Sequence, residues 1–176
     1  MNGRKTLFSP DRVYRYQLWR EWQLPKGLPY GGPDHIPLHS ASEFVMFIGL
    51  NPSTADEMQD DPTVRRCVGF SKRWGYGALC MTNLFAFRAT NPKDMMAAKN
   101  PVGPFNDNHL DSIALEASVI VCAWGRGGEH QNRESTVVSA LWNRRRKIKA
   151  FGFNKDGSPK HPLYLSNEAE LVPMVP

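Results

Sequence analysis

The sequence has few cysteines and no long apolar run, and both absences narrow the class of protein. The three cysteines, Cys67, Cys80 and Cys122, form no CxxC pair and lie inside apolar segments, which favours buried, reduced thiols over a zinc cluster. No apolar run approaches the roughly twenty residues of a membrane span, and the first residues lack the apolar stretch of a signal peptide. We therefore expect a cytoplasmic protein with no membrane partner.

The sequence also lacks internal repeats and low-complexity tracts. Its 176 residues, 41% apolar and 22% charged, suit one globular domain with a well-covered core. Within residues 1–176 we expect an N-terminal part, 1–43, with a strand or hairpin and then a loop from Leu24 to Glu43 that is dense in Pro and Gly. The core would cover 44–166, and a tail 167–176.

Basic residues exceed acidic ones only mildly. The 22 Lys and Arg oppose 17 Asp and Glu, which gives a net charge of +5. This balance favours a polyanionic partner such as DNA or a nucleotide. The plain alternative is that the charges solvate helix faces.

Short apolar runs alternate with helix-like stretches from residue 44 onward. The runs are "FVMFIGL", "ALCMTNLFAF", "SVIVCAWG" and "KIKAFGF". Continuous apolar runs indicate strands covered on both faces, and alternation with helices indicates βαβ units. We predict a single α/β domain with three layers, α/β/α, around a central, mostly parallel sheet of four to five strands. One helix is well signalled, because Asp61 can cap it and Pro62 suits its first position; it would end near Trp74 and Gly75.

Polar or flexible residues follow each of these apolar runs. Asn51 stands in "GLNPS", Asn83 in "MTNLF", a glycine-rich exit in "CAWGRGG", and His161 in "KHPLYLS". Taken singly, an Asn-Pro turn and a loop histidine are the plain interpretations. An open parallel sheet, however, binds its ligands beyond the carboxyl ends of its strands. The four segments therefore predict one shared site.

The order of "GLNPS", "TN", "VIVCAWG" and "HPLYLS" resembles the uracil-DNA glycosylase superfamily, an α/β fold with a central four-stranded parallel sheet. The matching residues are Gly49, Asn51, Pro52, Asn83, Trp124, Gly125, His161, Pro162, Leu165 and Ser166. The whole chain also resembles an uncharacterised family of bacterial and phage proteins, known as a domain of unknown function.

The glycosylase resemblance implies hydrolysis of the N-glycosidic bond of a damaged, mismatched or modified base in DNA, without a cofactor. His161 would donate a hydrogen bond to the oxyanion that develops on the base. Asn51 would position the attacking water without acting as a base, and Asn83 would pair with the base edge, which Gly49 would help to hold. Leu165 would wedge the duplex open, with Ser166 beside it at the nucleic acid.

The chain departs from the superfamily at several positions. Ser53 stands where the most active members have a tyrosine, so that a modified or methylated base could fit. Leu163 and Tyr164 replace the Ser and Pro of the last motif. No motif fixes the aromatic residue that stacks on the base; Phe70 and Trp74 are candidates, although either could belong to the core.

The segment "ADEMQDDPT" places Asp56, Asp60 and Asp61 shortly after Asn51. Helix capping in a solvated loop is the plain interpretation. The alternative is a divalent-metal or general-base site that activates the water.

Three arginines, Arg88, Arg126 and Arg133, follow strand ends and could bind phosphate, with solvated surface arginines as the default. Two further functions stay open beside the glycosylase: a non-catalytic module that binds nucleic acid or a nucleotide, and a metal-dependent nucleotide hydrolase that uses the acidic segment.

Overall fold

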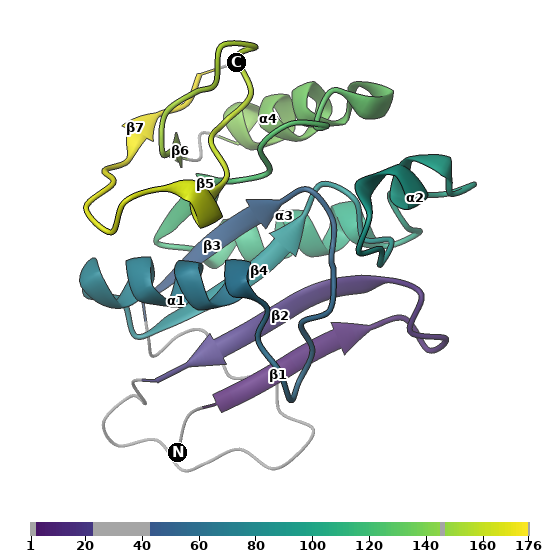
Figure 1. The fold of residues 1–176 in the computed structure, drawn as a ribbon, viewed down its shortest axis with the longest axis horizontal. Helices are drawn as coiled ribbons and strands as arrows, with labels where there is room; N and C mark the ends of the chain where they lie inside the picture. The colour runs from purple at the N-terminus through teal and green to yellow at the C-terminus, as the bar shows by residue number, and fades with distance from the viewer. Residues whose placement is uncertain (1–2, 23–42, 145–146, 176) are drawn as a thin grey trace.

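A computed structural model describes residues 3–22, 43–144 and 147–175 of the chain (Figure 1). Apart from Glu43, the predicted Pro/Gly-rich loop lies outside the described residues. The described strands are β1 (Gly3–Phe8), β2 (Arg15–Glu21), β3 (Phe44–Gly49), β4 (Ala78–Asn83), β5 (Val119–Cys122), β6 (Ile148–Ala150) and β7 (Val172–Pro173). The described helices are α1 (Pro62–Arg73), α2 (Pro92–Ala97), α3 (Asn106–Glu116) and α4 (Arg133–Asn143), with short 3-10 turns η1 (His130–Asn132) and η2 (Pro162–Tyr164).

The four central strands are parallel and stand in the order β4-β3-β5-β6. Every residue of β3, β4 and β5 is buried, because neighbouring strands and helices cover both faces. This confirms the mostly parallel central sheet that the continuous apolar runs predict.

The sheet is wider than predicted, since it contains seven described strands in the order β1-β2-β4-β3-β5-β6-β7. The β1–β2 hairpin joins the same sheet antiparallel to β4, and β7 pairs antiparallel with β6. The predicted tail, 167–176, thus contains the short strand β7. A strand of only two residues has no hydrophobic period, so its pairing with β6 is what defines it.

Helices cover the two faces of the central sheet, as the three-layer prediction requires (Figure 1). On one face α1 packs Val64, Cys67 and Phe70 against the sheet. On the other, α3 and α4 contribute residues such as Ile113 and Leu141. All three cysteines are free thiols buried in these layers, and burial raises the pKa of each thiol.

Helix α1 begins and ends where the sequence predicts. The Asp61 side chain accepts a hydrogen bond of 2.8 Å from the Val64 backbone N–H, and Pro62 occupies the first turn. The chain leaves the helix at Gly75, whose φ of +85° lies in the left-handed region.

Arginines of the β1–β2 hairpin hold the loop between β3 and α1 in place. Arg20 forms an ion pair with Asp60 at 2.6 Å and donates a hydrogen bond to the Asp56 carbonyl. Arg4 also pairs with Asp60, at 3.0 Å, and Arg15 donates to the Ala55 carbonyl at 2.7 Å. These polar contacts hold the loop together with the burial of Ala55 in the core.

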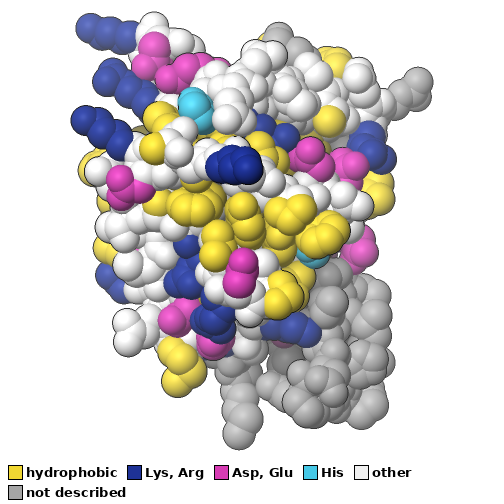
Figure 2. Space-filling model, turned by 90° about the vertical axis from the view of Figure 1, so that its right-hand side faces the viewer, with side chains coloured by type: hydrophobic (Ala, Val, Ile, Leu, Met, Phe, Trp, Pro, Cys, Tyr) yellow, Lys and Arg dark blue, Asp and Glu magenta, His cyan; other side chains and the backbone are white. Residues whose placement is uncertain are grey.

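Figure 2 shows the side of the molecule toward which β3 and β4 run. Apolar side chains gather in the middle of this face, and Lys and Arg side chains lie around them. None of the described helices is both long and apolar enough to cross a membrane.

We expect Arg20→Met to lower the free energy of unfolding by about 3 kcal/mol or more, because it leaves the Asp60 carboxylate without its buried partner. The Arg20 and Asp60 side chains are 5% and 15% exposed. Urea denaturation monitored by circular dichroism measures the change.

The matched control is Arg12→Met, which removes an ion pair to Glu57 in the same loop. Its side chains are 50% and 43% exposed, so the expected loss is about 1 kcal/mol or less. Equal losses in the two variants would contradict the importance of the buried pair.

Candidate functional site

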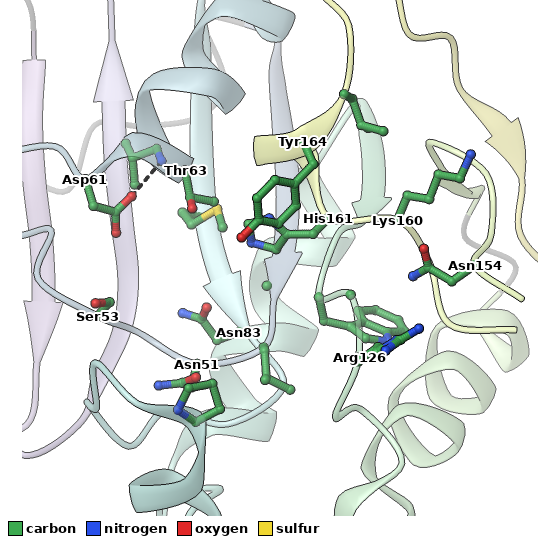
Figure 3. Close-up of a pocket in the computed structure, with 18 of the residues that line it drawn as sticks. Asn51, Ser53, Asp61, Thr63, Asn83, Arg126, Asn154, Lys160, His161 and Tyr164 are labelled. Carbon is green, nitrogen blue, oxygen red and sulfur yellow. Dashed lines mark hydrogen bonds between the residues drawn. The ribbon is translucent and has the colours of Figure 1, made fainter. Parts of the chain in front are cut away.

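A cavity of about 690 Å³ opens at the carboxyl ends of β3, β4 and β5. Figure 3 shows Ser53, Asp61 and Thr63 on one side of it, and Arg126, Asn154 and Lys160 on the other. Asn51, Asn83 and His161 all line the cavity, with Asn83 and His161 between its two sides. The segments that follow separate strands therefore meet at one place, as the sequence predicts.

Asn83 ends β4 beneath the cavity and is 2% exposed. Its Nδ2 is buried and has no hydrogen-bond partner among the described residues. Its Oδ1 lies against Gly49, where an added Cβ would come within 2.8 Å of that oxygen. Gly49 is thus required for the position of the amide. An unpaired buried amide is costly, which marks Asn83 as a group that a ligand would satisfy.

Asn51 is held by the backbone around it. Its Nδ2 donates hydrogen bonds of 2.7 Å to the Ala89 carbonyl and 3.0 Å to the Pro52 carbonyl. Both amide hydrogens are used, so the orientation of the side chain is fixed. Its Oδ1 remains as the acceptor that the side chain offers to a water.

His161 is held as a neutral hydrogen-bond donor. Its Nδ1 accepts a hydrogen bond of 3.3 Å from the Leu163 backbone N–H, so in the neutral ring the proton sits on Nε2. Burial lowers the pKa of His161, although the charge of Asp61 acts in the opposite direction. The ring therefore offers an Nε2–H donor at neutral pH.

Arg66 of α1 holds the loop that carries His161. Its guanidinium donates to the Pro162 and Leu165 carbonyls and to the Asn167 side chain. Helix α1 thus fixes two parts of the cavity wall: Asp61 at its first turn and the His161 loop along its side.

The three acidic residues that follow Asn51 have different surroundings. Asp56 is half-buried and accepts hydrogen bonds from the Gln59 and Met58 backbone N–H groups, which also lower its pKa. Asp60 is paired with Arg4 and Arg20. Of the three, Asp61 lines the cavity. The structure therefore separates the predicted acidic site and gives Asp56 and Asp60 roles in the loop.

No group of three His, Cys, Asp or Glu side chains that could hold a metal ion occurs in the described part of the chain. Asp61 is the acidic residue from the predicted set that a bound ligand could meet. One of its oxygens caps α1, and Figure 3 shows the other pointing toward Ser53.

Two of the three predicted phosphate-binding arginines lie away from the cavity. Arg133 is buried, donates to the Leu84 carbonyl at 2.8 Å and pairs with Asp107. Arg88 donates to the Arg12 carbonyl. Neither guanidinium group lines the cavity, and both donate hydrogen bonds within the protein. Arg126 lines the cavity and is largely exposed in its ion pair with Asp156.

The structure places the residues of the stacking and wedge predictions differently. Phe70 is buried in the core against Trp74 and Phe151, so it cannot stack on a ligand in the cavity. Leu165 lines the cavity but also packs against the core. The protruding side chain of this loop is Tyr164, which is 84% exposed and lies 5.8 Å from the His161 ring.

Sequence reasoning missed several residues of the cavity wall. Arg15, Thr63, Asn154, Lys160 and Tyr164 line it in addition to the predicted residues. Lys160 and Tyr164 adjoin His161 in sequence and could have been found from that proximity. Arg15 gave no such signal, since it stands among the aromatic residues of "VYRYQLW". Ser166 is exposed beside Leu165 and is not part of the wall.

The profile of a family described as a protein of unknown function, DUF1643, matches residues 15–163, so the chain belongs to this family. The resemblance to an uncharacterised family is thereby confirmed. No curated protein and no solved structure matches the chain.

We expect the His161 ring to titrate below pH 6.5 and to carry its proton on Nε2 when neutral. Protonation would put a second N–H on Nδ1 and so break the Leu163 hydrogen bond. Because the unfolded chain binds this proton more tightly, the contribution of His161 to stability is present above pH 6.5. It is lost as the pH falls through the lower pKa of the folded protein.

Nitrogen-15 NMR of the ring measures both the pKa and the tautomer. The free energy of unfolding between pH 7 and 5 should fall less steeply in His161→Gln than in the unmodified chain. His109, whose pKa is also lowered by burial, is present in both and cancels in the comparison. A ring pKa at or above 6.5 would contradict the account.

Proposed function

We propose that this DUF1643 member is a glycosylase-type hydrolase that acts in the cytoplasm on DNA and cleaves the N-glycosidic bond of a damaged, mismatched or modified base. The observation that carries the proposal is the buried Asn83 amide, whose Nδ2 has no partner among the described residues. An amide offers one donor and one acceptor, which is what the edge of a pyrimidine requires. Such a base must be turned out of the helix to reach the floor of the cavity.

The neutral His161 ring supplies the second element of the proposed site. When the bond between C1′ and the base nitrogen breaks, its electron pair leaves with the base, and negative charge develops on a base oxygen. The Nε2–H of His161 donates to that oxygen and stabilises the charge. A water oxygen then bonds to C1′, and the proton that the water loses passes through solvent to the departing base anion.

Asn51 fits the placement of that water but not its activation. Its Oδ1 can accept a hydrogen bond from the water, while its Nδ2 is fixed by two backbone carbonyls. An amide does not take up the proton at neutral pH. We therefore expect slow turnover, in which stabilisation of the leaving base supplies most of the rate.

The arrangement of the fold supports the same proposal. The strand order β4-β3-β5-β6 brings the four motif segments to one edge of a parallel sheet. Arg126 and Lys160 on the outer side of the cavity are suited to the phosphates beside the extruded base.

Two other functions are weighed against this one. A metal-dependent nucleotide hydrolase has less support, because Asp56 and Asp60 are engaged within the loop. A non-catalytic binding module is favoured by one observation, namely that Asn51 cannot serve as a base. Measurement of product separates binding from catalysis.

The proposal predicts base excision from oligonucleotides that contain uracil, a mismatched base or a 5-modified pyrimidine. Alkaline cleavage at the resulting abasic site measures the product. His161→Ala should lower the rate by about 100-fold or more, because it removes the donor to the developing oxyanion. Asn83→Ala should also lose activity, because the base edge is no longer held.

The control is Glu116→Gln, an exposed residue at the end of α3 that precedes β5, on the edge of the sheet opposite the cavity. It should keep the full rate. Tight binding of DNA with no abasic product from any substrate would favour the binding module. Turnover of free nucleotides that depends on a metal and on Asp61 would favour the nucleotide hydrolase.

Tyr164 predicts a difference between substrates. Its exposed ring can stack on the bases next to the gap that the extruded base leaves. Tyr164→Ala should therefore reduce excision more strongly in double-stranded than in single-stranded DNA, in a side-by-side rate measurement. Leu165→Ala tests the prediction that Leu165 wedges the duplex open. A larger loss of excision in double-stranded DNA for Leu165→Ala than for Tyr164→Ala would assign the wedge to Leu165.

A further inference from the structure

The inner wall of the cavity contains a buried arginine without a contacting anion. Arg15 lines the cavity and is 2% exposed. Its Nη1 donates to the Ala55 carbonyl at 2.7 Å, while its Nε is buried without a partner among the described residues. None of the ion pairs found within 4.0 Å among the described residues involves it. A buried charge in this state is costly unless a ligand compensates it.

A β-bulge sets the direction of this side chain. Phe8 of β1 pairs with Arg15, and the preceding Leu7 pairs with Gln17, so Tyr16 is an extra residue on β2. Tyr16 stacks on His109 of α3, whereas Arg15 reaches the loop before α1 on the other face. Bulges of this kind often re-aim side chains beside active sites.

The charges that surround Arg15 favour an anion. The charged side chains that act on it are Asp61, Arg88 and Arg20. Arg20 is paired with Asp60, and Asp61 gives one oxygen to the cap of α1. Burial lowers the pKa of Arg15 to about 10, which leaves it charged at neutral pH. Of the charged side chains that act directly on Arg15, two are guanidinium groups and one, Asp61, is a carboxylate.

The cavity also has room on this side. Arg15 donates to the Ala55 carbonyl, two residues from Ser53, so the cation lies on the side of the cavity that Ser53 lines. A volume of about 690 Å³ falls within the range of about 300–1,000 Å³ found for sites that enclose drug-sized molecules. A single pyrimidine ring does not need this space.

We propose that Arg15 binds an anionic group carried by the target base, and that the substrate is a pyrimidine with an acidic substituent such as a carboxylate. The inference rests on the proposed function and names its substrate class. Arg126 and Lys160, on the outer side of the cavity, are the residues proposed to bind the phosphates of DNA. Arg15, in contrast, is buried on the side where the base would lie. Its guanidinium can bind a carboxylate with two parallel hydrogen bonds.

Isothermal titration calorimetry with uracil and 5-carboxyuracil tests the inference on the full chain. The carboxylated base should bind about 10- to 100-fold more tightly, as expected for charge-assisted hydrogen bonds. Arg15→Met should abolish this difference in affinity. Arg15→Lys should retain part of the difference, since lysine keeps the positive charge but lacks the two parallel N–H donors of the guanidinium group. Arg12→Met, which removes an exposed arginine that contacts the same loop, should leave it unchanged.

Several outcomes would overturn the inference. If the unmodified chain bound the two bases equally well, the base pocket would be supported but the anion site would not. If the preference for 5-carboxyuracil persisted undiminished in both Arg15 variants, a residue other than Arg15 would bind the carboxylate. A third outcome is that 2′-deoxyuridine 5′-phosphate binds more tightly than 2′-deoxyuridine in a way that requires Arg15, while 5-carboxyuracil binds no more tightly than uracil. In that case the anion that Arg15 binds is the phosphate of a nucleotide. Failure of every ligand to bind, together with no excision, would remove the proposed function itself.

The variants must fold for this comparison, and urea denaturation verifies that they do. Should Arg15→Met not fold, Arg15→Lys and the ligand preference of the unmodified chain still decide the question. The second readout is the ratio of the excision rates of 5-carboxyuracil and uracil, each placed in the same oligonucleotide sequence. If this ratio were the same in Arg15→Lys as in the unmodified chain, the inference would be contradicted.

Discussion

The buried ion pair between Arg20 and Asp60 is the contact on which the cavity depends. It ties the loop between β3 and α1 to the β1–β2 hairpin, and Arg4 and Arg15 add contacts to the same loop. Asn51, Ser53 and Asp61 all belong to this loop, in which the Ala89 carbonyl also holds Asn51. The loop places Ala55 in the hydrophobic core, and its carbonyls and carboxylates accept hydrogen bonds from guanidinium groups, which can satisfy several acceptors at once.

Helix α1 connects this loop to the second half of the site. Asp61 caps its first turn, and Arg66 holds the carbonyls of the loop that carries His161. The Leu163 N–H then fixes the tautomer of His161. The result is a cavity that offers unpaired or fixed hydrogen-bond donors, with a buried cation on one side. Such groups are costly for folding alone, which is the physical reason to expect a polar ligand with a carbonyl edge and an acidic group.

The sequence was sufficient to predict those features that depend on local pattern. Continuous apolar runs identified the buried parallel strands, and Asp61 before Pro62 identified the start of α1. The meeting of Asn83 and His161 followed from the rule that strand ends share an edge. Features that depend on distant partners were not predictable. Phe70 packs against Phe151 from the far part of the chain, and the direction of Arg15 depends on a bulge that arises only when β2 pairs with β1.

The central claim is that Asn83 and His161 face one and the same ligand. Titration of the ¹⁵N-labelled chain with uracil, followed through the Asn83 side-chain amide and the His161 ring Nε2, tests it most directly. The account predicts that both signals shift together and saturate with a single shared dissociation constant, with the proton still on Nε2. Signals that do not move, or that report two different dissociation constants, would contradict it.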